Sequence, residues 1–495
     1  MPRELVTIQV GQCGNQVGCR FWELALREHA AYNTKGVYDE ALSSFFRNVD
    51  TRVEPHRNLP VGDGRGAIRT LKARSVIVDM ECGVINEMLK GPLGEVLDTR
   101  QLVSDVSGAG NNWAHGHHLY GPQYHEAILD KIRITAEDCD SLQSFMLLHS
   151  LGGGTGSGVG TYIVQMLADE FPGVFRFTGS VFPSEDDDVV TSPYNALLAL
   201  GQLVEHADCC LPVENQALID IVNRGETARE RAAGGSLSAP AGTSAGATSS
   251  TSSSSAGPGK SNKPFDGMNG IAASLLLHLT ASVRFEGPLN VDLNDITMNL
   301  VPYPRMHFLL SSMSPLQPPP RERDVGRQAL ALQPRALDQV FGEVFSREHQ
   351  LIRADPRHAT YLACGLIARG HTATIADINR NIARLRPQLN MVHWNSEGFK
   401  LGICSTPPVG SPFGLLCLAN NTAIASTFGT MRERFEKLYK RRFYTHHYEQ
   451  YMELGGFEEA RECVADLTRQ YQALEGATGA PAVTRLRPRG LSFLP

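Results

Sequence analysis

The heptapeptide Gly-Gly-Gly-Thr-Gly-Ser-Gly, at residues 152–158, separates a buried-strand pattern from a helical pattern. Residues 145–148 before it are all apolar, and residues 159–171 after it repeat apolar side chains at helical spacing. Glycines at a strand-to-helix turn let backbone N–H groups close around an anion, with a helix N-terminus aimed at the same point. The pattern predicts a phosphate-binding loop, to which Thr155 and Ser157 could add hydroxyl donors. A flexible surface loop is the alternative, but such linkers seldom lie between a buried strand and an amphipathic helix.

The spacing of these glycines excludes two common nucleotide-binding motifs. No Gly-Lys-Ser/Thr ending follows, as a Walker loop requires, and a G-x-G-x-x-G motif that began at Gly154 would end on Val159. Residues 259–261 do have the Walker ending, but Ser254 stands where that motif needs its first glycine. The loop therefore belongs to another class of phosphate site.

Composition is that of an ordinary globular chain and argues against several kinds of partner. The 495 residues are enough for two or three domains, and the formal net charge of −6 argues against nucleic acid as the main partner. The N-terminus has no signal-peptide pattern, and the most apolar stretch, residues 271–283, is too short to span a bilayer, so we expect no membrane segment. Ten scattered cysteines without a C-x-x-C pair predict a reduced, cytoplasmic protein. For the histidines at 115, 117 and 118 we expect surface or packing roles.

The first part of the chain, residues 1–223, alternates short apolar runs with helical patterns. This alternation is typical of a doubly wound α/β domain with a mostly parallel sheet. We expect strands at residues 5–10, 75–79, 145–149 and 175–182, with helices such as 15–30 and 126–139 between them. Ligands of such sheets bind at the carboxyl ends of the strands, so the turns there are candidate sites.

Composition divides the rest of the chain into three parts. Residues 224–263 are rich in Ser, Ala and Gly, with eight serines and threonines in succession at 248–255, and they can bury too little apolar surface to offset the entropy of ordering. We predict that they are disordered. Residues 264–425 are expected to begin with one long apolar helix, 265–285, and to continue as an intermediate α/β domain. Residues 426–495 are expected to form a helical hairpin and a short basic tail.

Polar turns follow two of the other predicted strands. The first strand leads into Gly-Gln-Cys-Gly-Asn-Gln at residues 11–16, a second turn suited to an anion. The strand at 75–79 leads into Asp79 and Glu81, which lie on one strand face. Beside a phosphate, these carboxylates would hold Mg²⁺, often through water, whereas a solvated strand end is the alternative. A third turn, at residues 107–113, adds backbone donors and side-chain amides.

Several longer segments resemble the tubulin superfamily, in the order in which that family has them. They read VGQCGNQVG, DMECG, the glycine-rich heptapeptide, GAGNNWAHGH, TSPYNALLAL, SVRFEGPLNVDLNDI and NLVPYPRMHF. The resemblance extends over nearly the whole chain except the predicted disordered stretch and the last residues. It implies a GTP-binding domain, a long central helix, an intermediate domain and a C-terminal helical hairpin, in a cytoskeletal protein that assembles with other tubulins.

The resemblance also implies site residues. Glu81 would organise Mg²⁺. Asn215 and Asn269 match the asparagines that read guanine, since an amide both accepts and donates, and Phe265 matches the aromatic residue that stacks on the base. Taken alone, each asparagine would sooner be an ordinary capping or surface residue. The residues that would hold the phosphates are Gln12, Cys13, Ala109, Gly110, Asn111, Ser150, Gly153, Gly154, Thr155 and Gly156.

Two departures from the family pattern concern the sugar and the hydrolytic step. Ser192 stands where the family has a ribose-contacting glutamate, and Asp188 replaces a neutral position, so we expect altered ribose contacts. Residues 287–295 resemble the motif G-x-x-N-x-D-x-x-E, with which one tubulin subunit completes GTP hydrolysis on its neighbour, but end in Asp295. The hypothesis is that Asp295 acts in trans as a general base. A solvated helical turn is the competing interpretation.

Within the superfamily, residues 27–52 resemble the epsilon type. The Ser/Ala-rich insertion and the short basic C-terminus are not features of the tubulins that build the microtubule lattice. The resemblance implies a protein of the centrosome, centriole or basal body that maintains triplet microtubules, with delta-tubulin and centriolar proteins as partners. The insertion lies between Asn215 and Asn269, where it would hinder head-to-tail stacking or recruit a partner, unless it is a neutral insertion.

Two other functional classes remain open. One is an oxidoreductase with a dinucleotide site, which the absence of G-x-G-x-x-G disfavours. The other is a GTP-dependent switch or adaptor that does not polymerise, whose guanine site would have the same sequence.

Overall fold

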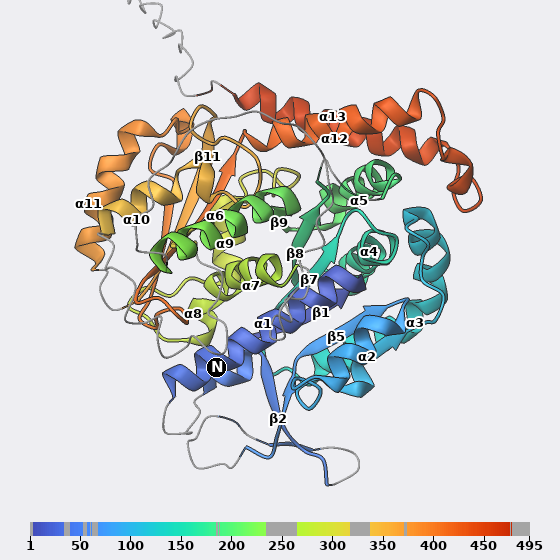
Figure 1. Cartoon of the computed structure of the whole chain (residues 1–495), viewed down its shortest axis with the longest axis horizontal. Helices are drawn as coiled ribbons and strands as arrows, with labels where there is room; N and C mark the ends of the chain where they lie inside the picture. Colours follow the sequence, from blue (N-terminus) through green and yellow to red (C-terminus); the bar gives the residue numbers. More distant parts are fainter. Residues whose placement is uncertain are drawn as a thin grey trace, which may run out of the picture.

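The computed structural model describes residues 3–33, 40–52, 57–59, 61, 68–184, 187, 189–233, 265–316, 337–370, 374–475 and 477. Its centre is a six-stranded sheet in which every neighbouring pair of strands is parallel (Figure 1). The predicted doubly wound parallel sheet is confirmed. The strand order is β6 (Leu102–Ser104), β5 (Ser75–Asp79), β1 (Glu4–Val10), β7 (Leu142–Ser150), β8 (Phe175–Phe182) and β9 (Cys209–Glu214).

Helices cover both faces of this sheet, which is why its strands are apolar on both sides. Successive residues of β1 point to opposite faces: Val6 and Ile8 lie in one core and Leu5 lies in the other. The first core includes α3 (Gly121–Glu137), α4 (Gly160–Glu170) and α5 (Ser192–His206). The second includes α1 (Gly11–Tyr32), α2 (Cys82–Lys90), α6 (Asn215–Ala233) and α7 (Asp266–Leu279).

Two smaller sheets and a helical hairpin complete the described part of the chain. The mixed sheet has the order β10 (Leu310–Ser314), β13 (Gly414–Asn421), β11 (Tyr361–Arg369), β12 (Phe399–Cys404), and packs with α9 (Leu293–Leu300), α10 (Leu337–Val344) and α11 (Ile375–Leu385). The other sheet joins β2 (Phe46–Asp50) to β3 (Arg57–Leu59) and β4 (Thr70–Ala73). The predicted hairpin is confirmed: α12 (Ile424–Tyr439) and α13 (Gly455–Leu474) lie side by side over α5 (Figure 1). Of the helices described, none is long and apolar enough to cross a membrane.

The prediction of one continuous helix over residues 265–285 was wrong. The helix α7 ends at Leu279, and a separate short helix, α8 (Ala281–Arg284), follows. The carbonyl oxygen of Leu277 accepts hydrogen bonds from Arg284 Nη2 (2.8 Å) and Arg369 Nη1 (3.4 Å). The helical hydrogen-bond ladder is interrupted at Thr280, and the two arginine side chains satisfy the carbonyl at this break.

The helix α6 also continues past the predicted boundary at residue 224, as far as Ala233. The rest of the stretch predicted to be disordered, from residue 234 to 263, lies outside the described residues, as does most of the predicted basic tail.

A buried ionic cluster joins α1, α8 and β11. The carboxylate of Glu28 pairs with Arg284 Nη2 at 2.7 Å and with Arg369 Nη1 at 2.9 Å, and all three side chains are almost fully buried. Burial by itself raises the pKa of Glu28, but the two arginines lower it to about 2. The imidazoles of His29 and His278 lie beside this cluster, and burial is the main cause that lowers the pKa of both to about 3. Arg284 and Arg369 contribute to this lowering, because their two positive charges outweigh the one negative charge of Glu28.

These neutral histidines predict an acid-sensitive fold. The unfolded chain protonates His278 near pH 6.5, whereas the folded chain protonates it only near pH 3. The stability contributed by this neutral histidine is therefore complete above pH 6.5 and is lost progressively as the pH falls toward 3. At pH 5 the loss is about 2 kcal/mol.

We expect His278→Gln to reduce the fall in unfolding free energy between pH 7.5 and 5 by about this amount, as measured by denaturant titration. The same change at the exposed His358 is the matched control. Equal slopes in both variants would show that His278 is not a source of the acid sensitivity.

Candidate functional site

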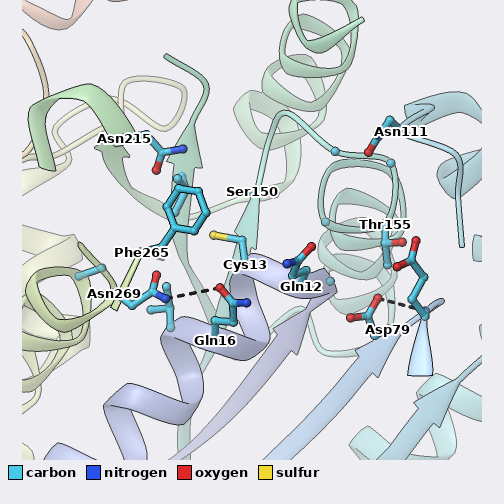
Figure 2. Close-up of a pocket in the computed structure, with 18 of the residues that line it drawn as sticks. Gln12, Cys13, Gln16, Asp79, Asn111, Ser150, Thr155, Asn215, Phe265 and Asn269 are labelled. Atoms are coloured by element: carbon cyan, nitrogen blue, oxygen red, sulfur yellow. Dashed lines mark hydrogen bonds between the residues drawn. The ribbon is translucent and has the colours of Figure 1, made fainter. Parts of the chain in front are cut away.

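A cavity of about 330 Å³ lies at the carboxyl edge of the six-stranded sheet, beside the N-terminus of α1 (Figure 2). Asp295 does not line it. Some residues that line the cavity have no role assigned by the resemblance, among them Gln16, Asp79, Leu218 and Met268. The structure brings together in this one cavity all the residues that the resemblance assigns to nucleotide or Mg²⁺, namely Gln12, Cys13, Glu81, Ala109, Gly110, Asn111, Ser150, Gly153, Gly154, Thr155, Gly156, Asn215, Phe265 and Asn269.

The start of α1 lies directly against the glycine-rich loop. Gly11 has a φ of +71°, and a Cβ there would lie 2.9 Å from the amide nitrogen of Gly156. At Gly14, a Cβ would lie 2.1 Å from the carbonyl oxygen of Leu148, so no larger side chain fits. Among the described residues, neither α1 nor the π-helical turn Thr155–Val159 has a side-chain cap. Two helix N-termini with uncapped first-turn N–H groups therefore meet at the cavity, an arrangement that favours an anion.

The glycine-rich loop is held by side chains beneath it. His149 is buried, and burial lowers the pKa of its imidazole to about 4, so the ring is neutral. Its Nδ1 donates to the carbonyl of Gly156 (2.8 Å), which can only accept, and its Nε2 accepts from Ser180 Oγ (2.8 Å). Ser157, expected to offer its hydroxyl to a phosphate, instead is buried and donates to the carbonyl of Gly153. The sequence interpretation missed His149, for which the one signal is a polar residue at the end of an apolar strand.

The turn at residues 108–113 forms another part of the wall at this end of the cavity, through residues 109–111. Gly108, Gly110 and Asn111 all have left-handed backbones, with φ of 62°, 56° and 52°. A Cβ on Gly154 would lie 2.8 Å from the amide nitrogen of Asn112, so this turn and the glycine-rich loop are in direct contact.

A single buried amide, that of Asn195 in α5, joins these two loops. Its Nδ2 donates to the carbonyls of Asn111 (2.8 Å) and Gly152 (2.9 Å). Its Oδ1 accepts from the backbone N–H of Trp113 (2.9 Å) and from the hydroxyl of Tyr448 (2.5 Å). All four hydrogen-bonding positions of the amide are used. The sequence interpretation gave Asn195 no role, although it is an amide in an otherwise apolar helix.

Two carboxylates flank the same end of the cavity. Asp79, the last residue of β5, is buried, and burial raises its pKa to about 6 despite hydrogen bonds from the Glu81 N–H and from Asn15 Nδ2, each at 3.3 Å. Glu81 is exposed at the cavity wall. The Oδ1 atom of Asn15, beside Asp79, is a buried acceptor with no partner among the described residues. This set of oxygen atoms suits a hard cation such as Mg²⁺.

Aromatic and amide side chains occupy the other end of the cavity. Figure 2 shows Phe265, Asn215 and Asn269 at one end, away from Asn111, Thr155 and Asp79. Phe265 has a left-handed backbone (φ 71°) just before α7, and its side chain is 56% exposed. That strain costs on the order of 1 kcal/mol. The exposed ring lines the cavity, where a flat heterocycle could stack on it. Asn269 donates weakly to Gln16 Oε1 (3.5 Å), so its amide can also turn to a ligand.

Ser192 and Asp295, at which the chain departs from the family pattern, do not line the cavity. Ser192 Oγ donates to Asp187 Oδ2 (2.7 Å), while Asp188 lies outside the described residues, so altered ribose contacts remain a prediction. Asp295 is half exposed on α9, where it forms a capping box with Asp292 by accepting from its N–H (3.3 Å). The competing interpretation of Asp295 as an ordinary helical-turn residue therefore has a structural basis, and a role in trans stays a hypothesis.

Comparison with known proteins assigns the family. Residues 4–223 match the GTPase domain of the Tubulin/FtsZ family, and residues 304–433 match the tubulin C-terminal domain. The tubulin epsilon chains of Homo sapiens and Mus musculus are each 52% identical to this chain over 482 residues, which cover 96% of this chain and 97% of each relative. The tubulin beta-4 chain of Zea mays is 32% identical over 480 residues, 96% of both chains. Because both domains match tubulin family models, the oxidoreductase alternative is rejected. The chain belongs to the tubulin family, is more similar to these epsilon chains than to the beta chain, and is thereby a GTP-binding cytoskeletal protein.

Proposed function

We propose that this chain binds GTP together with Mg²⁺ in the cavity and acts at centrosomes, centrioles or basal bodies in organising triplet microtubules. The observation that carries the nucleotide part is the order of groups along the cavity. Carboxylates and the glycine-rich loop lie at one end, and an aromatic ring between two amides lies at the other. A nucleoside triphosphate with its cation has its groups in the same order.

The phosphates would be bound by backbone N–H groups of residues 109–111 and 153–156, with Gln12 and the hydroxyls of Ser150 and Thr155. Glu81, assisted by Asp79, would hold Mg²⁺ through oxygen ligands, and the cation would neutralise the phosphate charge. Burial raises the pKa of the Cys13 thiol to about 12, so Cys13 would meet the phosphates as a neutral thiol. Asn215 and Asn269 would bind the edge of guanine, with the base stacked on Phe265.

Hydrolysis would be completed by a second subunit. Apart from Asp79 and Glu81 at the cation end, the described lining residues include no carboxylate or histidine that could act as a general base. Asp295 has the chemistry for this step and is accessible to another subunit from α9.

The cellular role and partners rest on similarity to the epsilon chains. We propose other tubulins, delta-tubulin among them, and proteins of the centriole or basal body as partners. A switch or adaptor that binds GTP without polymerising is the alternative.

Removal of one base-reading amide tests guanine recognition. The purified chain should release guanine nucleotide on denaturation, as identified by chromatography and mass spectrometry. Asn269→Ala should weaken GTP binding about tenfold, because a buried polar edge of the base loses its partner. The exposed Asn390→Ala should not change GTP binding in equilibrium titration. Recovery of adenine nucleotide alone would refute the proposal.

The exchange Asp295→Asn tests hydrolysis in trans. Asparagine keeps an oxygen that can accept the N–H of Asp292, so the capping box survives while the general base is lost. We expect assembly-stimulated phosphate release to fall at least about 100-fold, with GTP affinity unchanged. Asp377→Asn, which alters the same first-turn position of α11, serves as the control. Unchanged phosphate release in the Asp295 variant would contradict the role in trans.

Sedimentation separates an assembly subunit from a switch. An assembly subunit should sediment as larger species with GTP than with GDP or without nucleotide, at concentrations where a switch would remain one size. A size that does not depend on nucleotide, in a chain that binds GTP, would favour the adaptor alternative.

A further inference from the structure

The connection between α12 and α13 includes residues 441–451, which contact the walls of the cavity. We call these residues the hairpin loop. The hydroxyl of Tyr194 donates to the carbonyl of Phe443 (2.7 Å). The Nδ2 of Asn112 donates to the carbonyl of His447 (2.9 Å). Tyr194 precedes Asn195, whose amide binds both cavity loops, and Asn112 itself belongs to one of these loops. The backbone of the hairpin loop is therefore bound to the cavity walls at two points.

A third contact is fully buried. Tyr448 and Asn195 both have no exposed surface, and the Tyr448 hydroxyl donates to Asn195 Oδ1 at 2.5 Å. The same Asn195 amide binds the carbonyls of Asn111 and Gly152, one from each phosphate-facing loop. Thr191 Oγ1 also donates to Asn111 O (3.2 Å). A shift of either loop therefore changes the hydrogen bond that holds Tyr448.

The hairpin loop presents exposed side chains under backbone strain. Phe443 and Tyr444 are 47% and 42% exposed, and His446 and His447 beside them are also exposed. Arg442 and Tyr444 have left-handed backbones, with φ of 50° and 61°. Such strain in residues other than glycine persists only where surrounding contacts impose it. Part of that constraint comes from α12, whose Tyr439 and Leu438 carbonyls accept from the N–H groups of Arg442 (2.9 Å) and Phe443 (3.2 Å). The three contacts with Tyr194, Asn112 and Asn195 add to it and connect the shape of this exposed surface to the cavity loops.

We propose that Asn195 is a positioning residue through which the occupant of the cavity sets the conformation of the hairpin loop. A triphosphate bound between the glycine-rich loop and the turn at 108–113 would fix the carbonyls of Gly152 and Asn111, and with them Asn195, Tyr448 and the loop's exposed aromatic surface. Coupling between two binding sites is reciprocal. If the triphosphate raises the affinity of the hairpin loop for a partner by some factor, that partner raises the affinity of the cavity for the triphosphate by the same factor. This inference rests on the proposed binding of GTP.

The test removes one hydroxyl and leaves the buried ring in place. In the full chain, amide hydrogen exchange of residues 441–451 is measured without nucleotide, with GDP and with GTP. GTP should slow exchange of this segment at least about threefold in the native chain. In Tyr448→Phe the slowing should disappear while the segments at 108–113 and 152–158 stay protected, and the affinity for GTP should fall about fivefold.

Tyr439→Phe is the matched control, because Tyr439 lies in the same helical hairpin and its hydroxyl binds Glu458 (3.3 Å), away from the cavity. It should keep both the native affinity and the nucleotide-dependent protection. A local unfolding caused by the Tyr448 change would appear as faster exchange without nucleotide, so a second variant, Tyr194→Phe, removes the hydroxyl that donates to the carbonyl of Phe443 and should weaken the protection in part.

The outcomes separate the inference from the function on which it rests. If the native chain bound no guanine nucleotide, the proposed function would fail and the coupling with it. If the native chain bound GTP but residues 441–451 exchanged equally fast in all three states, or if Tyr448→Phe matched the native chain, the coupling alone would be overturned.

Discussion

The parallel pairing of β1 between β5 and β7 is the constraint on which the rest of the site depends. Because all three strands run in one direction, their carboxyl ends deliver the start of α1, the Asp79 carboxylate and the glycine-rich loop to one edge. The missing side chains of Gly11 and Gly14 then let α1 approach the loop until backbone meets backbone. Without that approach, the two uncapped helix N-termini would not face the same point, and the cavity would have no phosphate-binding end.

Buried polar groups hold the parts of the molecule in one arrangement. Glu28 neutralises one of two buried arginines and joins α1 to α8 and β11, so the parallel-sheet domain and the mixed sheet share one ionic cluster. The amide of Asn195 joins α5 to the two cavity loops and to the C-terminal hairpin by hydrogen bonds. Each such group would be costly to leave unpaired in the interior, and so few alternative packings are open to the chain.

Sequence patterns predicted the strands at 75–79 and 175–182 with the bounds that the structure has, because strands buried on both faces are short apolar runs between clear turns. The central helix was predicted as one element and is two: at the break, the Leu277 carbonyl is bound by Arg284 and by Arg369 from a distant strand, a contact that no local pattern specifies. The residues assigned to the cavity from motifs do line it. His149 and Asn195 were missed, since a polar residue that serves the backbone of another loop leaves no periodic signal.

The sequence by itself determined the class of site: glycine spacing, the turn that follows the first strand and the carboxylates at 79 and 81 are local features, and local backbone chemistry decides what they can bind. Only the tertiary structure decided how the site is supported and what it touches. The Tyr448–Asn195 contact joins residues 253 positions apart, and Phe265 reaches the cavity from the start of α7. Contacts of that kind depend on how complete elements pack, which no local pattern specifies.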